Sequence, residues 1–349
     1  SRLDALQGAG FLTDRGTGVP AGGRPGSRLV FNPSARTVLA ADVGATRATV
    51  AVTDLAGDVL ASRRLPLDIT EGPERVLARL AGTWRELVRD TDLTAVSPAG
   101  VGIGLPGPVD PSSGRPHHPL IMPAWNGFDV PAHVRAEFGV PVLVDNKVNL
   151  MALGEHAHSF PGTDHMIVVR VASGIGSGVI SNGVLHRGAI GAAGDLGHIR
   201  APDGDDVLCG CGNTGCLEAV AGGSAVAARL RAKGVDARTS ADVVALLRAG
   251  NVEAGQAIRQ AGRTIGEVLA ACVTLVNPSL IVVGGDLAAT GEMLLAGMRE
   301  AVYRRSPPLA TENLRIVPSR AGEDAGVLGA VTMVLNHALS AGVVDQELG

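Results

Sequence analysis

Three of the chain's four cysteines lie within eight residues, and a histidine lies one short loop before them. The four side chains are His198, Cys209, Cys211 and Cys216. One imidazole nitrogen and three thiolate sulfurs complete the tetrahedral coordination of Zn²⁺, and four protein ligands leave no position for a catalytic water. The sequence therefore predicts a structural zinc site that shapes a loop.

Disulfide bonds and free buried thiols are the alternatives to zinc for these cysteines. A bridge between Cys209 and Cys211 would be strained because a single residue separates them, and no apolar stretch has the pattern of a cleavable secretory leader. The fourth cysteine, Cys272, is expected to pack in the core instead. It shares a helical face with the apolar residues Ile258, Ile265, Leu269 and Val276.

The composition is that of an ordinary globular protein. The chain has 349 residues, of which 46% are hydrophobic and 18% are charged. That length suffices for two or three domains, each with its own core. No apolar stretch reaches the roughly 18 residues that a membrane-spanning helix needs, and no lipidation motif is present. We therefore expect a cytoplasmic protein.

The first 36 residues are basic, in contrast to the rest of the chain. They hold five arginines and two aspartates, a formal charge of +3, so the remaining residues carry −7 within the net charge of −4. A short helix, followed by strands that start at Phe11 and Arg28, is typical of the latter half of a winged helix. Arg15, Arg24 and Arg28 would then contact operator DNA, and the other helices would precede Ser1. The alternative is a flexible leader or an expression remnant.

A glycine-bearing turn follows the first long apolar strand, which is expected at residues 38–41. Its polar residues are Asp42 and Thr46, with Gly44 between them. A carboxylate and a hydroxyl on such a turn can hold a hydrated Mg²⁺ and a nucleotide phosphate, because the backbone approaches closely. The turn alone is a modest indication of a phosphate site.

The second half of the chain repeats this plan. An expected strand at 166–172 leads into Gly174 and Gly176, and another at 280–283 leads into Gly284 and Gly285. Glycine turns that face each other can clasp a nucleotide between two domains. If the neighbouring motifs are not considered, the turn at Gly174 could equally be an ordinary hairpin turn.

Polar residues also follow the apolar run 142–144, in the order Asp145, Asn146 and Lys147. A helix is expected to start close to Asn149. Because α/β sheets bind ligands at the carboxyl ends of their strands, we expect these residues at a ligand site.

Taken together, these motifs resemble the ROK family, which is named for repressors, open reading frames and kinases. Residues 42–46 are similar to its first phosphate motif, 173–178 to the second and 283–285 to the adenosine motif. The most specific element is 194–198 with the cysteine run, which resembles the family's signature and zinc site. Residues 22–25 resemble the end of the winged helix of its repressor branch.

The resemblance implies an α/β fold, the two-lobed actin-like ATPase (ribonuclease H-like) fold with a partial N-terminal winged helix. The partial winged helix and linker would span residues 1–36. A small α/β lobe would span 37–146, completed at 324–349 by a helix near Val327 to Leu339. A large α/β lobe that carries the zinc loop would span 147–323.

One departure from the family pattern concerns catalysis. The family's sugar kinases have an Asn-Asp pair whose aspartate is the general base toward a sugar hydroxyl, and here the pair reads Asn146-Lys147. A lysine with its ordinary pKa of about 10.4 stays protonated at neutral pH unless it is deeply desolvated. Loss of a general base costs roughly 10²–10⁴-fold in rate, so we expect little catalysis. Asp145 could act in place of Lys147, as an alternative.

Other positions depart from the family as well. Asp195 stands where the family has a sugar-binding glutamate, and Ala45 and Arg47 replace a glycine and a lysine of the phosphate turn. One hypothesis is that Lys147 and Asp195 pair across the pocket.

The sequence thus predicts a transcriptional regulator of carbohydrate-related genes. Its expected partners are operator DNA, a second copy in a homodimer or dimer of dimers, and a small effector such as a sugar or sugar phosphate. An ATP-dependent sugar kinase, which would need ATP and Mg²⁺, is the main alternative, and a nucleotide-binding scaffold without DNA is a third. The effector would bind near Asn126, Gly127, Asn146, Lys147, Asp195 and His198.

Overall fold

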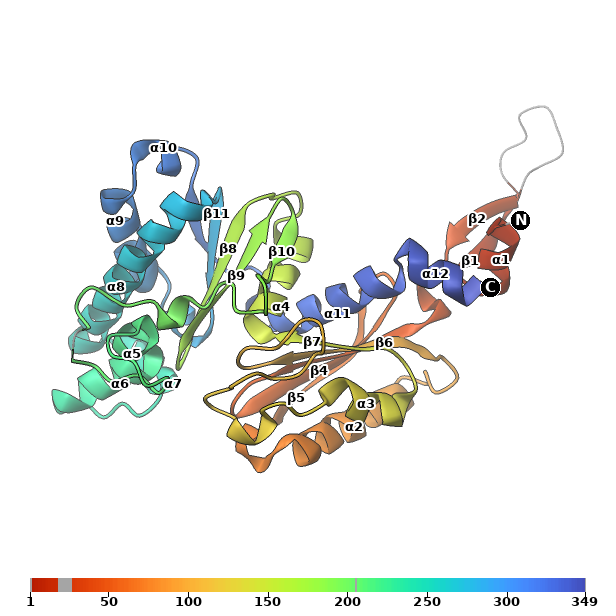
Figure 1. Ribbon diagram of the computed structural model, residues 1–349, viewed down its shortest axis with the longest axis horizontal. Helices are drawn as coiled ribbons and strands as arrows, with labels where there is room; N and C mark the ends of the chain where they lie inside the picture. The colour runs from red at the N-terminus through yellow and green to blue at the C-terminus, as the bar shows by residue number, and fades with distance from the viewer. Residues whose placement is uncertain (1, 18–26, 205, 349) are drawn as a thin grey trace.

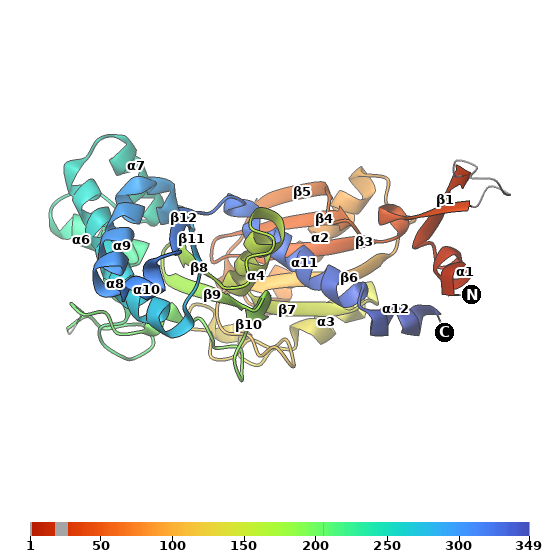
Figure 2. The same ribbon diagram turned by 90° about the horizontal axis from the view of Figure 1, so that it is seen from above.

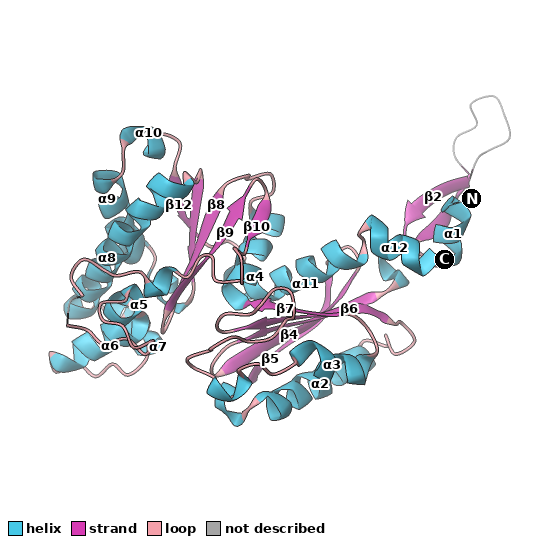
Figure 3. Cartoon of the chain, in the orientation of Figure 1, coloured by secondary structure: helices cyan, strands magenta, loops and turns pink. Residues whose placement is uncertain are grey.

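The chain folds around two five-stranded mixed sheets that lie side by side, with helices packed against both (Figures 1 and 3). These elements come from a computed structural model, which describes residues 2–17, 27–204 and 206–348. A two-stranded sheet lies at the end of the molecule where both termini are found (Figure 2).

The first sheet has the strand order β5-β4-β3-β6-β7. β4 runs antiparallel to both of its neighbours, β5 and β3, whereas β3, β6 and β7 are parallel. The carboxyl ends of these last three strands therefore meet at one edge. The strands are β3 (Thr37–Val43), β4 (Arg47–Asp54), β5 (Val59–Pro66), β6 (Pro98–Leu105) and β7 (Val142–Asn146).

Both faces of the first sheet are covered, which explains why β3 is almost entirely buried. Its alternate residues point to opposite faces: Leu39 joins the core under α2 (Pro73–Asp90) and α3 (Val130–Phe138). Val38 joins a second core under α11 (Ala325–Ala338). The expected C-terminal helix is confirmed, and it packs against the first sheet.

The second sheet has the order β10-β9-β8-β11-β12. Its antiparallel pairs are β10 with β9 and β9 with β8, and β8, β11 and β12 run parallel. The strands are β8 (Met166–Val171), β9 (Ile175–Ser181), β10 (Val184–His186), β11 (Leu280–Gly284) and β12 (Arg315–Pro318).

The largest apolar core lies between the second sheet and the helices on one of its faces. Cys272, which lies on the long helix α8, packs against this core, as predicted. The helices on this side and at its edges are α5 (Leu217–Ala221), α6 (Gly223–Ala232), α7 (Ser240–Arg248), α8 (Val252–Val276), α9 (Glu292–Arg305) and α10 (Pro308–Thr311).

Helix α4 (Lys147–Gly154) lies between the two sheets and contacts α11 closely. A Cβ atom on Gly329 of α11 would lie 1.7 Å from the Leu150 carbonyl oxygen, and one on Gly154 would lie 2.0 Å from that of Ala325. Only glycine permits this crossing. One turn of π-helix, Glu155–Ser159, continues α4.

The N-terminal segment has the predicted helix and two strands, α1 (Arg2–Gly8), β1 (Leu12–Thr17) and β2 (Ser27–Phe31), with the strands antiparallel. Phe11 is buried in the core beneath α11. Arg2 also pairs with Asp345 of α12 (Ala341–Leu348) at 2.5 Å. Arg15 and Arg28 are exposed, and Arg24 lies outside the described residues.

Among the described residues, no single helix has both the length and the apolar composition of a membrane span. Two consecutive helical segments, Gly322–Ala338 and Ala341–Leu348, are together long and apolar enough, but the chain bends by 56° between them.

Candidate functional site

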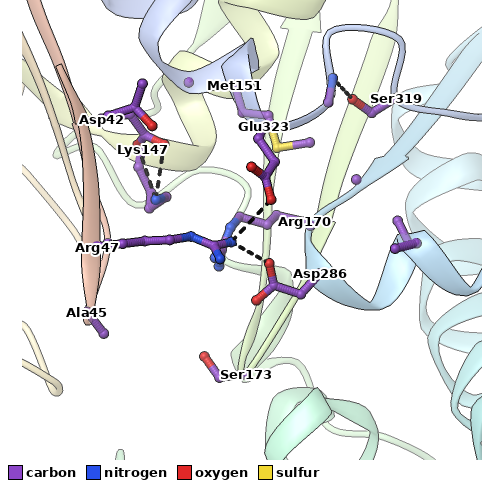
Figure 4. A pocket seen from close by; sticks show the side chains of 18 of the residues that line it. Asp42, Ala45, Arg47, Lys147, Met151, Arg170, Ser173, Asp286, Ser319 and Glu323 are labelled. Carbon is purple, nitrogen blue, oxygen red and sulfur yellow. Dashed lines mark hydrogen bonds and ion pairs between the residues drawn. The ribbon is translucent and has the colours of Figure 1, made fainter. Parts of the chain in front are cut away.

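Lys147 is the first residue of α4, at the carboxyl edge of the first sheet, and it points toward β3 (Figure 4). Its ammonium lies 3.1 Å from Asp42 Oδ1 and 3.2 Å from Oδ2, and it also donates to the Val43 carbonyl at 3.3 Å. The two side chains are only 11% and 13% exposed. The ammonium thus donates two hydrogen bonds, to Asp42 Oδ2 and to the Val43 carbonyl. Asp42 Oδ1 lies close to the ammonium but accepts no hydrogen bond from the described residues.

The surroundings of Lys147 act on its pKa in opposite directions. The pKa of Lys147 is lowered overall, because burial is the largest influence and lowers it; the Asp42 carboxylate raises it, and the nearby Arg170 lowers it further. The contact with Asp42 therefore favours the charged form that burial disfavours.

A cavity of about 380 Å³ opens between the two sheets beside this ion pair. It brings together most of the residues expected in phosphate and nucleotide turns, which come from both halves of the chain. Of these expected residues, Asp42, Gly44, Thr46, Gly284 and Gly285 line it, whereas Gly174 and Gly176 are not among its lining residues. Ser173, next to Gly174, does line it.

Ion pairs cross this cavity from the first sheet to the segments that follow β11 and β12 (Figure 4). Arg47 of β4 lies 2.6 Å from Asp286 and 3.8 Å from Glu323. Arg64 of β5 pairs with Glu323 at 2.7 Å and with Asp324 at 2.9 Å, and the hydrogen bond to Asp324 raises the pKa of Arg64. The pair of Arg47 with Asp286 thus joins the first sheet to the segment after β11, whereas Arg64 joins the first sheet to the segment just before α11.

Both carboxylate oxygens of Asp145 accept hydrogen bonds from neighbouring residues. It is 3% exposed, and Arg187 Nε donates to its Oδ2 at 2.7 Å. Its Oδ1 accepts from the Asn146 backbone at 2.7 Å and from the Asn149 side chain at 2.8 Å. These contacts hold both carboxylate oxygens, which argues against Asp145 as a replacement general base.

The other expected effector residues lie apart from this cavity. Asn146 caps α4, because its side chain accepts from the Val148 backbone at 2.9 Å. Asn126 is exposed and its Oδ1 accepts from the His118 backbone at 2.9 Å. Gly127 follows with a φ of +71°, a conformation that favours glycine.

Asp195 and His198 lie on a short turn next to β9. The turn is fastened by Ser177, whose backbone and hydroxyl both donate to the Gly194 carbonyl, at 3.0 and 2.7 Å. Removal of the Asp195 carboxylate from water raises its pKa, and His198 opposes that rise. The hypothesis that Lys147 pairs with Asp195 is wrong, because Asp42 holds the ammonium.

The four expected metal ligands converge. One ligand atom from each of His198, Cys209, Cys211 and Cys216 lies within 4.8 Å of the others. Cys209 Sγ is 3.7 Å from His198 Nδ1, and the sulfurs of Cys211 and Cys216 are 3.5 Å apart. A disulfide requires about 2.05 Å, whereas tetrahedral zinc, with sulfur at about 2.3 Å, separates its ligands by almost 4 Å. The cluster therefore has the geometry of a metal site.

The local backbone prepares this cluster. The Cys209 backbone donates to the Asn213 carbonyl at 2.8 Å, and Gly212 and Gly215 adopt positive φ angles of 91° and 76°. A hydrogen bond from the Asn213 backbone, with smaller contributions from the neighbouring thiols, lowers the pKa of Cys211 to about 7, whereas burial raises the pKa of Cys209 and the pKa of Cys216. A thiol with the pKa of Cys211 readily supplies the thiolate that binds metal.

Glu218 is a residue that the sequence interpretation missed. It is half-buried in the first turn of α5, and its Oε1 lies 3.8 Å from Cys209 Sγ. A Cβ atom on Gly174 would lie 2.6 Å from its Oε2, so the carboxylate packs directly against the glycine turn. The sequence does show an acidic residue two positions after Cys216, and this spacing could have indicated a contact with the cysteine cluster.

Comparison with known proteins agrees with this architecture. A family model described as "ROK family" matches residues 38–337. The xylose repressor of Caldicellulosiruptor bescii is 30% identical over 97% of this chain and 88% of its own length.

Solved structures of the same family also superpose well. A ROK family transcriptional regulator, described as a homologue of the Escherichia coli MLC protein, gives a TM-score of 0.83 with 26% identity over 99% of this chain and 89% of that one. The Streptomyces griseus glucokinase, solved with glucose and AMPPNP, gives 0.74 with 26% identity over 85% of this chain and 98% of its own. The expected two-lobed, actin-like α/β fold is thereby confirmed.

Proposed function

Because this chain belongs to the ROK family, we propose that it is a transcriptional regulator that responds to a sugar or a sugar derivative. The observation that carries the proposal is the ion pair of Lys147 with Asp42. A general base must accept a proton from its substrate, and an ammonium held by a carboxylate and a carbonyl has no free lone pair for that proton. The position therefore favours sensing over phosphoryl transfer.

In this proposal the effector binds near the carboxyl end of β7 and the turn before the cysteine cluster. The residues concerned are Asn126, Gly127, Asn146, Lys147, Asp195 and His198. An effector that binds one relative position of the two sheets more tightly than another shifts the population toward it. Because Arg47 and Asp286 link the two sides, such a shift would break or strengthen that link.

In this proposal the chain has three functional parts. Residues 1–36 form the end of a winged helix that contacts DNA through Arg15, Arg24 and Arg28. Residues 37–146 with 324–349 form one lobe, and 147–323 form the other. In a dimer, a change in lobe position would alter the spacing of the two DNA-binding modules relative to operator half-sites.

We also propose that His198, Cys209, Cys211 and Cys216 hold structural zinc. The ion would supply rigidity and no reactive position, since the protein fills all four coordination sites. Cys209 contacts Glu218, and Glu218 backs the turn at Gly174. The zinc loop would thereby support the turn that faces the cavity.

The test uses the natural full-length protein and DNA from the region upstream of its own gene. Fluorescence anisotropy would measure DNA affinity with and without each of a panel of pentoses, hexoses, N-acetyl amino sugars and their phosphates. We expect specific binding in the range of about 10⁻⁸–10⁻¹¹ M that one class of sugar changes by at least about tenfold. Binding no tighter than to unrelated DNA would contradict the proposal.

A sugar kinase is the second candidate, supported by the retained Asp42 turn and by the fit to the glucokinase structure. It predicts sugar-dependent ADP release with ATP and Mg²⁺. Turnover with any sugar in the panel, abolished by Asp42→Asn, would favour this candidate over the regulator.

A further inference from the structure

An ion pair joins the edge strands of the two large sheets, and it connects Asp145 of β7 with Arg187, which directly follows β10 (Figure 2). Arg187 Nε donates to Asp145 Oδ2 at 2.7 Å. β7 is the last strand in the order of the first sheet, and β10 is the first in the order of the second. The pair therefore links the two halves of the molecule at a different place from the pair of Arg47 with Asp286, which lies at β4 and β11.

The charge of Asp145 is balanced from the other half of the molecule. Its side chain is 3% exposed, whereas that of Arg187 is 30% exposed. Among the described residues, no other lysine or arginine lies within ion-pair distance of this carboxylate. Moving Arg187 away would leave a buried charge without its partner, which is strongly unfavourable. Arg187 therefore stabilises the present position of Asp145.

Asp145 in turn positions the first turn of α4. Its Oδ1 accepts from the Asn146 backbone at 2.7 Å and from the Asn149 side chain at 2.8 Å. Asn149 is 2% exposed, so water would not replace the hydrogen bond if the carboxylate moved away. A shift of Asp145 would therefore also move Asn146 and Lys147, where the helix begins.

Arg187 also begins the segment that leads to Asp195. At Gly191 this segment packs against the first half of the chain, because a Cβ atom there would lie 2.2 Å from the Val109 carbonyl oxygen. At Gly194 it packs against β9, where a Cβ atom would lie 2.3 Å from a carbonyl oxygen. The φ angles of +82° and +88° at these two positions also favour glycine. The segment thus has little freedom, and the position of Asp195 depends on that of Arg187.

A cavity of about 430 Å³ opens beside the ion pair, and Asp145 and Arg187 both line it. It offers space into which the Arg187 side chain can turn when nothing holds it. The hydrogen bond, rather than close packing, therefore keeps the guanidinium at Asp145. Replacement of either charged group should loosen this edge of the molecule.

We propose that Arg187 is a positioning residue, which sets, through Asp145, the spacing between the two groups of residues that bind the effector. One group lies at the start of α4, and the other contains Asp195 and His198. This role rests on the proposed function, because it needs an effector that contacts both groups. Arg187 itself does not touch the effector. When only a fraction of the molecules holds the binding spacing, the apparent affinity falls by that fraction.

Amide hydrogen exchange of the ligand-free protein tests the joint itself. Arg187→Met should speed exchange on both sides of the pair, in residues 146–150 and in 188–198, since neither side would then hold the other. Exchange in α8 should stay as in the wild type, which separates a local change from general unfolding. Arg85→Gln, which removes a surface pair with Glu137, should change neither segment. Faster exchange in only one of the two segments, or in neither, overturns the proposal.

A neutral pair distinguishes the contact from the loss of one side chain. Asp145→Asn and Arg187→Gln together allow an amide hydrogen bond between the two positions without a buried charge. The double variant should therefore exchange more slowly than either single variant, and exchange as fast as in the faster single variant would show that the two residues do not act as a unit. If Arg187→Met does not fold, Arg187→Lys replaces it. An intermediate exchange rate is then expected, and wild-type exchange overturns the proposal.

Isothermal titration measures the effect on the binding site, with D-xylose, D-glucose, N-acetyl-D-glucosamine and their phosphates as titrants. Arg187→Met should weaken binding of the titrant that the wild type prefers by about tenfold or more, as expected when about a tenth of the molecules holds the binding spacing. Melting curves establish that each variant is folded. Wild-type affinity in Arg187→Met overturns the positioning role and leaves the regulator intact. A wild type that binds none of the titrants overturns both the effector site and the positioning role, whatever the exchange shows.

Discussion

Lys147 and Asp42 come together because of strand direction. Asp42 lies near the carboxyl end of β3 and Lys147 directly follows β7, and these two strands run parallel in the first sheet with β6 between them. Two strand spacings of about 4.8 Å separate them, a gap that a lysine side chain can span. The sequence identifies both positions, but the expected partner, Asp195, is wrong, because the order of strands in the sheet cannot be read from spacing along the chain.

At this scale we predict strong coupling between the two residues. Lys147→Met should lower the free energy of unfolding by about 3–5 kcal/mol, since it leaves a buried carboxylate without its partner. Adding Asp42→Asn to Lys147→Met should recover much of that loss. Denaturant unfolding of the single and double variants measures the coupling.

Asp195 provides the control for this cycle. Lys147→Met and Asp195→Asn should be additive within about 0.5 kcal/mol, as expected for residues that share no contact. Coupling with Asp195 and additivity with Asp42 would contradict the ion pair described here.

The convergence of His198, Cys209, Cys211 and Cys216 was predictable from the sequence, whereas the position of Glu218 was not. Cysteines at such short spacing converge by local backbone geometry, which sequence reveals. The contact of Glu218 with Gly174 depends on α5 and the end of β8 meeting in space, which spacing alone cannot show.

At the scale of elements, removal of metal from the cysteine loop should loosen the turn near Gly174. We expect about one zinc per chain by elemental analysis. Chelation, or Cys216→Ser, should lower the melting temperature and speed amide exchange in residues 172–176. Cys272→Ala, on α8 and outside the cluster, should leave both the zinc content and this exchange unchanged. Wild-type protein that carries no zinc would contradict the assignment.

The crossing of α4 and α11 supplies another prediction. Gly329→Ala would press a methyl group against the Leu150 carbonyl, so we expect a loss of about 1–3 kcal/mol or more. Gly82→Ala on α2, where nothing lies within 4 Å, should instead stabilise the protein by about 0.4–1 kcal/mol. Thermal unfolding measures both, and a neutral Gly329→Ala would show that the helices can separate.

For the whole molecule, the two strand-turn-strand halves were predictable, but their relative position was not. Hydrophobic periodicity marks each strand and helix locally. A contact that joins the halves, that of Arg47 with Asp286, links residues more than two hundred positions apart. Nothing in the local pattern of either half identifies its partner.

The N-terminal segment is tied to the body of the molecule by Phe11, which is 6% exposed. Phe11→Ala should remove about 3–5 kcal/mol of packing and speed amide exchange across residues 2–15. Phe31→Ala removes a ring that is 43% exposed and should have much less effect. Equal exchange in both variants would show that the segment is held by other contacts.

Helix α11 begins against Asp42 and continues into a bend from which α12 reaches Arg2. Its 14 residues make a rod about 21 Å long. A tilt of roughly 10° about the first turn would swing the far end by about 4 Å. Helix α11 would therefore amplify a small displacement at the Asp42 carboxylate into a larger displacement of α12 and of the N-terminal segment that Arg2 joins to it.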